Sequence, residues 1–129
     1  MPEPIRRLAE QILKNPVHIK TIQTKERTNL DIHQQYYVVE EHEREDAVVR
    51  LIDDQDPEKA IVFCRTRDEV DRLNTSLVGR GYNSRPLHGD MEQSRRQEVM
   101  GAFRKGAVDI LVATDVAARG LDVADLSHV

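Results

Sequence analysis

Three groups of residues along the chain have the chemistry to bind phosphate. Each group directly follows a predicted strand and combines a residue that can cap a helix with a nearby arginine or glycine. Free backbone N–H groups at the start of a helix attract anions, and a guanidinium adds charge-assisted hydrogen bonds. Along one surface, such groups would bind a string of phosphates without reading the bases. The candidate residues are Thr66, Arg67, Gly89, Gln93, Arg96 and Thr114.

The first group follows the apolar residues 60–64. Thr66 and Glu69 have the spacing of a capping box, in which each side chain accepts a hydrogen bond from the backbone of the other. That structural role is sufficient to explain Thr66. Arg65 and Arg67, however, flank a predicted helix N-terminus, where the helix dipole favours acidic residues. Their presence indicates that an anion binds there.

The second group begins at Gly89, which leaves room for the backbone of a ligand to come close. Asp90 and Gln93 again have the spacing of a capping box. Arg95 and Arg96 follow within the first two turns of the predicted helix. We therefore expect one of these two arginines to reach the same surface as Gly89.

The third group begins at Thr114, which with Asp115 opens a short turn, since both are typical N-cap residues. One interpretation has this turn contact a phosphate while Asp122 accepts a hydrogen bond from a sugar hydroxyl. The other is a capped turn closed by an internal pair between Arg119 and Asp122. The residues alone leave both interpretations open.

Neither Cys64 nor His88 is expected to do chemistry. Cys64 lies in an apolar run and lacks the His partner that would make it a nucleophile. His88 is more typical of a structural residue at the end of a strand than of a general base. No metal site is predicted, because no Cys, carboxylate or second His clusters with His88. The single cysteine excludes an intrachain disulfide and is typical of a reducing, cytoplasmic environment.

The segments that position these groups alternate between helical periodicity and short apolar runs. Apolar runs without alternation, separated by helices, are typical of a parallel sheet covered on both faces. The sequence therefore predicts a doubly wound α/β fold, in which ligands bind beyond the carboxyl ends of the strands. Helices are expected over residues 4–14, 42–53, 67–78 and 91–104, a helical turn over 115–119, and strands over 17–19, 34–39, 60–64, 84–87, 110–113 and 126–129.

Composition limits the classes of protein and partner. The chain has 129 residues, enough for one domain with a core, and a net charge of -4. With that balance, any nucleic-acid site must be a local basic patch. No apolar run approaches the roughly 20 residues needed to cross a bilayer, and no signal peptide is recognised. We therefore expect no membrane partner and a cytoplasmic location.

The three groups resemble, in order and spacing, motifs of the DEAD-box ATP-dependent RNA helicases. Residues 113–122 (Ala-Thr-Asp-Val-Ala-Ala-Arg-Gly-Leu-Asp) resemble the complete motif V of that family, and residues 61–66 resemble motif IV. Residues 87–96 resemble the Gln-x-x-Arg element. Residues 1–5 resemble the stretch that follows the Ser-Ala-Thr motif of the first motor domain. The resemblance covers essentially the whole chain.

The resemblance implies a RecA-like fold, the second motor domain of such a helicase, truncated before its last strand and helix. Residues 1–19 would then be the tail of the first RecA-like domain, residues 20–31 the interdomain linker, and residues 32–129 the second domain. Any dimer of this chain would be an artefact of truncation, formed through an exposed sheet edge or the orphaned first helix.

The resemblance also implies roles for single residues. Gly120 and Asp122 would face the nucleotide, with Asp122 near the ribose hydroxyl, and Arg119 would contact the first domain when the two domains close on ATP. The residues implied to hold the RNA backbone are Thr66, Gly89, Arg96 and Thr114, with Gln93 in support.

The function expected for the parent protein is ATP-dependent remodelling of short RNA duplexes by a two-domain clamp, with RNA, Mg-ATP and the first domain as partners. The sequence contains neither a Gly-x-x-x-x-Gly-Lys-Thr loop nor an Asp-Glu-Ala-Asp motif, which bind the phosphates and Mg²⁺. The chain alone is therefore expected to be catalytically inactive.

The sequence leaves two alternative functions open. The first is a DNA translocase motor domain, whose motif V would normally diverge from the one in this chain. The second is a non-motor α/β domain that binds a phosphorylated ligand, which predicts a natural C-terminus near residue 129.

Overall fold

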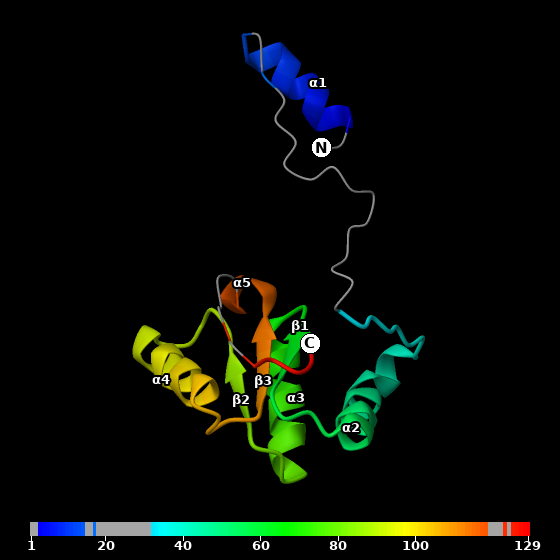
Figure 1. Ribbon diagram of the computed structural model, residues 1–129, viewed down its shortest axis with the longest axis vertical. Helices are drawn as coiled ribbons and strands as arrows, with labels where there is room; N and C mark the ends of the chain where they lie inside the picture. The colour runs from blue at the N-terminus through cyan, green and yellow to red at the C-terminus, as the bar shows by residue number, and fades with distance from the viewer. Residues whose placement is uncertain (1–2, 15–16, 18–31, 119–122, 124) are drawn as a thin grey trace. The chain divides into compact units, whose positions relative to one another are not determined.

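A computed structural model of the chain describes residues 3–14, 17, 32–118, 123 and 125–129 (Figure 1). The chain divides into two compact units, residues 1–37 and residues 38–129. Each unit has its own secondary structure, and the larger one contains the sheet and all the candidate phosphate-binding residues.

The smaller unit contains the predicted first helix, α1 (Glu3–Ile12). It begins one residue before the expected start and ends two residues before the expected end. Its apolar side chains are exposed, with 70% of Ile12 open to solvent. Val17, the first residue of the predicted strand 17–19, has no regular secondary structure. The rest of that strand and the predicted linker 20–31 lie outside the described residues.

The prediction of a strand over residues 34–39 is wrong. Residues 32–40 form neither helix nor strand, and the side chains of Tyr36 and Val38 are 88% and 91% exposed. Tyr and Val favour strands only where a neighbouring strand supplies hydrogen bonds and a surface to pack against. Within the described residues no strand pairs with this segment, so its strand propensity has no partner to satisfy it.

The larger unit alternates helices and strands, as the sequence predicts. The 3-10 turn η1 and the helix α2 come first, and three helices then alternate with three strands. The elements are η1 (Glu41–Glu43), α2 (Arg44–Gln55), β1 (Ala60–Cys64), α3 (Arg67–Gly79), β2 (Ser84–Leu87), α4 (Gln93–Arg104), β3 (Ile110–Thr114) and α5 (Asp115–Ala118).

The three strands form one parallel sheet with the order β1-β3-β2 (Figure 1). In the register, Cys64 of β1 lies beside Thr114 of β3, and Leu87 of β2 lies beside Ala113. The strands therefore end at nearly the same level. The predicted strand 126–129 is reduced to a parallel bridge between His128 and Ala60, on the edge of β1 away from β3.

Each face of the sheet packs against a different set of helices. On one face, Leu111 and Ala113 of β3 contact a cluster that includes Phe103 of α4. On the other face, Ile110 and Val112 contact a cluster formed with α2 and α3. The apolar residues of β3 thus alternate between two cores, which confirms the predicted α/β sheet with helices on both faces.

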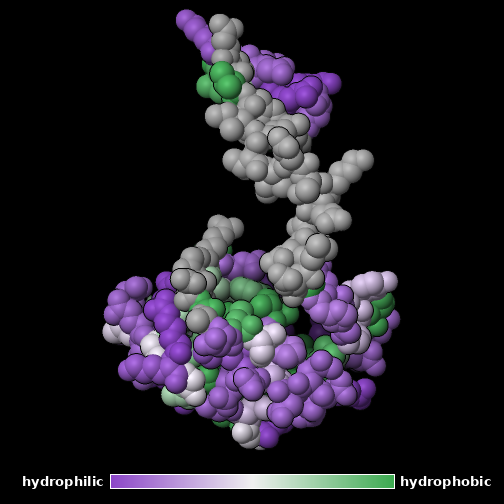
Figure 2. Space-filling view, viewed as in Figure 1, coloured by the Kyte–Doolittle hydropathy of each residue, from purple (hydrophilic) through white to green (hydrophobic). Residues whose placement is uncertain are grey.

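Figure 2 shows hydrophobic side chains gathered over the sheet of the larger unit, between hydrophilic side chains of the flanking elements. Exposed apolar residues at or just after the strand ends include Phe63 of β1, 44% exposed, and Val116 of α5, 74% exposed. The carboxyl edge of the sheet therefore combines apolar surface with the polar groups that follow each strand.

Candidate functional site

The sheet brings the three predicted phosphate-binding groups to one edge. Thr114 is the last residue of β3, while Thr66 and Gly89 each follow the last residue of their strand by two positions. Because the strands are parallel and end in register, these three positions share the carboxyl edge. This is the edge at which open α/β sheets bind their ligands.

The N-terminus of α3 has the predicted capping box. The Oγ1 atom of Thr66 accepts a hydrogen bond from the backbone N–H of Glu69 at 3.2 Å. The Oε2 atom of Glu69 accepts from the backbone N–H groups of Thr66, at 3.1 Å, and Arg65, at 2.9 Å. These hydrogen bonds, the one from Thr66 foremost, lower the pKa of Glu69. Since the Thr66 oxygen accepts in the cap, its O–H group can still donate to a ligand.

The two arginines beside this cap pair with carboxylates. The guanidinium of Arg65 lies 3.7 Å from Glu69 and 3.9 Å from Glu41. The guanidinium of Arg67 forms an ion pair with Asp90, which lies in the loop after β2. The sequence pattern suggested an external anion for these arginines, but it could not show that carboxylates of the same chain balance their charge.

The predicted capping box of Asp90 and Gln93 is wrong. Helix α4 begins at Gln93, two residues later than expected, and its N-cap is Glu92, whose side chain makes no capping hydrogen bond. The carboxylate of Asp90 instead pairs with Arg67 of α3. A tertiary ion pair has therefore replaced the local hydrogen bond that the spacing suggested.

Of the two arginines in the first turn of α4, only Arg96 turns toward the strand ends. Its Nη2 atom donates to the backbone oxygen of Ala117 in α5 at 3.2 Å, and the contact is partly buried. Arg95 instead pairs with Glu98 on its own helix at 2.9 Å. Arg96 thus links the first turn of α4 to α5, which follows β3, and its other N–H groups can still donate to a ligand.

His88 is held between β2 and α3. It is only 9% exposed, and its Nε2 atom lies 3.2 Å from Oδ1 of Asp71. Its Nδ1 atom is buried without a hydrogen-bond partner. This environment agrees with the structural role expected of His88, next to Gly89. The contribution of Asp71 carried no signal in the sequence, because it lies 17 positions away on another element.

The thiol of Cys64 is held in its neutral form. Partial burial, with smaller contributions from the negative charges of Glu69 and Glu45, raises the pKa of Cys64 to about 11. A thiol with that pKa carries almost no thiolate near neutral pH, and the thiolate is the nucleophile. The prediction of a structural cysteine therefore agrees with its surroundings.

Three of the predicted site residues, Arg119, Gly120 and Asp122, lie outside the described residues. The two interpretations of the turn after Thr114 therefore both remain predictions. In the described part of the chain, no group of three or more potential metal ligands comes together. No helix among the described residues has the length and apolarity to span a membrane.

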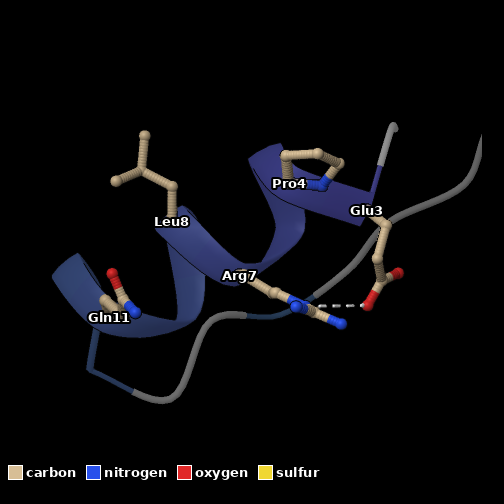
Figure 3. A pocket seen from close by; sticks show the side chains of 5 residues that line it. All are labelled: Glu3, Pro4, Arg7, Leu8 and Gln11. Atoms are coloured by element: carbon tan, nitrogen blue, oxygen red, sulfur yellow. Dashed lines mark ion pairs between the residues drawn. The ribbon is translucent and has the colours of Figure 1, made fainter.

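A surface hollow lies on α1. Figure 3 shows that its lining comes entirely from one helix, with Arg7 directed toward Glu3, its ion-pair partner at 3.6 Å. Pro4, Leu8 and Gln11 complete the lining. A hollow along one side of a single helix lacks the convergent polar groups of a ligand site. The carboxyl edge of the sheet is therefore the candidate site.

Comparison with protein families shows a match between residues 43–129 and the helicase conserved C-terminal domain. Over 129 residues the chain is 53% identical to the DEAD-box ATP-dependent RNA helicase RhpA of Helicobacter pylori. It is 48% identical to the DEAD-box ATP-dependent RNA helicase CshA of Bacillus cereus. These alignments cover 100% of the chain but only 26% and 24% of the relatives. The chain thus spans about a quarter of the length of the curated relatives that it matches.

Solved structures show the same likeness. The chain is similar to a DEAD box protein from the hyperthermophile Methanococcus jannaschii, with a TM-score of 0.69 and 36% identity. That match covers 98% of this chain and 33% of the other. It is also similar to the E. coli DEAD-box protein SrmB, bound to regulator of ribonuclease activity A, with a TM-score of 0.62 and 39% identity. The second match covers 67% of this chain and 51% of the other.

Proposed function

The chain belongs to the helicase conserved C-terminal domain family, and its relatives are DEAD-box RNA helicases. We propose that it is one of the two domains of an ATP-dependent clamp that closes on RNA. Its RecA-like fold and its membership of the DEAD-box group are confirmed. In the proposal, the carboxyl edge of the sheet binds the RNA backbone. The comparisons favour neither a DNA translocase nor a non-motor phospho-ligand domain.

The observation that carries the proposal is the convergence of three loops at one edge of the sheet. Thr66, Gly89 and Thr114 follow three strands that end in register. Arg96 of α4, the helix that follows the Gly89 loop, donates to Ala117 of α5, the helix that follows Thr114. An edge lined by hydroxyls, a guanidinium and helix N-termini suits a run of phosphates and sugars. Such contacts are made to the backbone, so binding would not depend on the base sequence.

The roles within the site follow from the chemistry of each side chain. Thr66 and Thr114 would donate from their hydroxyls to phosphate oxygens, and Arg96 would add a charged donor. Gly89 would let the RNA backbone approach closely, because a side chain there would occupy that space. Gln93 begins α4 and would support the same loop.

The proposed contribution of this domain to ATP binding is based on its family membership. Gly120 and Asp122 would face the nucleotide, and Arg119 would contact the first domain in the closed state. ATP is the substrate, and its Mg²⁺ and phosphate ligands would come from the first domain. Because RNA and ATP would both bind between the two domains, each would favour closure and raise the affinity for the other.

The remaining parts of the proposal concern domain organisation and location. Residues 1–19 would end the first RecA-like domain, residues 20–31 would link the domains, and residues 32–129 would form the second domain. The proposed location is the cytoplasm, in keeping with the single neutral thiol, Cys64.

RNA binding by the chain tests the proposal. Fluorescence anisotropy with labelled oligouridylate and oligoadenylate should show weak, similar affinities that fall as salt rises. Arg96→Ala should weaken binding about tenfold, because it removes a charge-assisted hydrogen bond to the RNA.

Arg95→Ala is the matched control for that experiment. It removes the same charge from the neighbouring position, where the side chain pairs with Glu98 instead of reaching α5. Binding by this variant should stay near that of the wild type, and thermal melts should show that both variants fold. If Arg96→Ala folds and binds RNA as tightly as the wild type, the proposal that RNA binds at the carboxyl edge of the sheet is wrong.

A further inference from the structure

We propose that Asp90 is a built-in competitor for RNA at the carboxyl edge, whose carboxylate occupies the guanidinium of Arg67 until a phosphate replaces it. This inference rests on the proposed function and concerns how the same site is regulated. It assigns a role to Asp90, which the sequence pattern had placed in a capping box.

The geometry of the pair places it across the edge. Arg67 is the first residue of α3, directly after the cap Thr66, and Asp90 lies in the loop between β2 and α4. In the sheet, β3 lies between β1 and β2. The ion pair between Arg67 and Asp90 therefore joins the start of α3 to the loop after β2, on either side of the end of β3, where Thr114 is located.

The position of Arg67 explains why the pair forms in the absence of RNA. The N-terminus of a helix carries partial positive charge, so a guanidinium there gains from a nearby anion. Asp90 supplies that anion from the next loop. A phosphate placed on the same edge would offer Arg67 the same type of contact, with a bidentate geometry that guanidinium groups favour.

Exposure makes the pair replaceable. The side chains of Arg67 and Asp90 are 57% and 64% exposed, so water and salt weaken their attraction. The neighbouring carboxylate of Glu69 is different, because two backbone N–H groups fix it in the capping box. The partner of Arg67 can therefore be displaced, whereas Glu69 is part of the structure of the helix end.

A purely structural brace predicts the opposite effect of mutation. If the pair only held the two loops in place, loss of the Asp90 charge would loosen the edge and weaken RNA binding. If Asp90 competes with phosphate, Asp90→Asn would free Arg67 and strengthen binding. The direction of the change thus separates the two roles.

The test is a double-mutant cycle measured by anisotropy with labelled oligouridylate. We expect Asp90→Asn to bind roughly two- to fivefold more tightly than the wild type, the range that a surface ion pair can supply. The gain should be largest at low salt, because salt screens the ion pairs that Arg67 forms with Asp90 and with phosphate. In the Arg67→Ala background, Asp90→Asn should give little or no gain.

Two control variants measure how much a change in net charge alone alters RNA affinity. Glu58→Gln changes the charge by the same amount just before β1, at the opposite edge of the sheet, and should leave RNA affinity near that of the wild type. Arg104→Ala, at the end of α4, is the corresponding control for Arg67→Ala. Equal gains from Asp90→Asn and Glu58→Gln would overturn the inference, because they would reflect whole-molecule charge alone.

The outcomes distinguish this inference from the proposed function. RNA binding that depends on Arg96 but is unchanged or weakened by Asp90→Asn would overturn the inference and leave the RNA edge intact. No RNA binding by the wild type or by any variant would overturn both. Tighter binding by Asp90→Asn that disappears without Arg67 would support both.

Discussion

Thr66 shows how one residue can serve the fold and the site at once. Its oxygen accepts the capping hydrogen bond from Glu69, which fixes the start of α3. The hydroxyl hydrogen takes no part in that bond and can point to a ligand at the carboxyl edge. A hydroxyl held by a capping box is already oriented, so less conformational freedom would be lost when RNA binds.

The capping box predicts a pH dependence at the residue scale. The pKa of Glu69 is lowered from its ordinary value of 4.5, so its contribution to stability is present above that value and is lost as pH falls through the lower, folded-state pKa. Glu69→Gln keeps an oxygen acceptor but loses the charge. Urea unfolding should show that the wild type is more stable than Glu69→Gln at pH 7 and that the difference shrinks on acidification. A difference independent of pH would contradict this account.

At the scale of elements, helix α2 is attached to α3 by two kinds of contact. Three exposed ion pairs join η1 and α2 to arginines at or near α3, including Arg80 with Asp46 at 3.0 Å. Beneath them, Val49 and Ile52 of α2 are buried against apolar residues of α3. Exposed ion pairs contribute about 0 to 1 kcal/mol each, while a buried aliphatic side chain contributes roughly 1.5 to 3 kcal/mol. The apolar contacts therefore hold α2 in place.

A pair of variants tests which contact holds α2. We expect Ile52→Ala to lower the free energy of unfolding by about 2 to 5 kcal/mol, because it removes buried methyl and methylene groups and leaves a cavity. Asp46→Asn should lower it by about 1 kcal/mol at most, since it breaks only an exposed pair. Urea unfolding followed by circular dichroism measures both values. A larger loss from Asp46→Asn than from Ile52→Ala would show that the ion pairs dominate.

At the scale of the whole molecule, the net charge of -4 contrasts with the proposed RNA edge. Part of the acidic charge lies on η1 and α2, where Glu41, Glu45 and Asp46 pair with arginines at or near α3. A net charge describes the average field of a protein, whereas phosphate binding depends on the local arrangement of donors. An acidic chain can thus present a phosphate-binding edge, although its affinity would be low.

The absence of phosphate-loop and Asp-Glu-Ala-Asp motifs from the 129 residues predicts no ATP hydrolysis by this chain alone. Phosphate release should stay at the level of buffer, with or without added RNA, at Mg-ATP concentrations that support helicases. The measurement needs highly purified protein, and a mock purification serves as the control. ATP turnover that copurifies with the chain and changes on substitution of its own residues would refute the prediction.

The sequence by itself determined what depends on neighbours along the chain. The apolar runs 60–64 and 110–113 became strands because such runs are stable in a parallel sheet whose faces are both covered. The capping box of Thr66 and Glu69 spans three positions, so its spacing was sufficient to predict it. The order of strands and helices then placed all three groups at the carboxyl edge.

Tertiary structure decided what depends on partners far away along the chain. Asp90 pairs with Arg67, 23 positions away, instead of capping α4, and Arg96 rather than Arg95 reaches the turn after β3. Residues 34–39 have the composition of a strand but remain unpaired within the described structure. Local spacing cannot reveal these outcomes, because an ion pair, a side-chain direction and a strand each depend on which surface packing brings alongside.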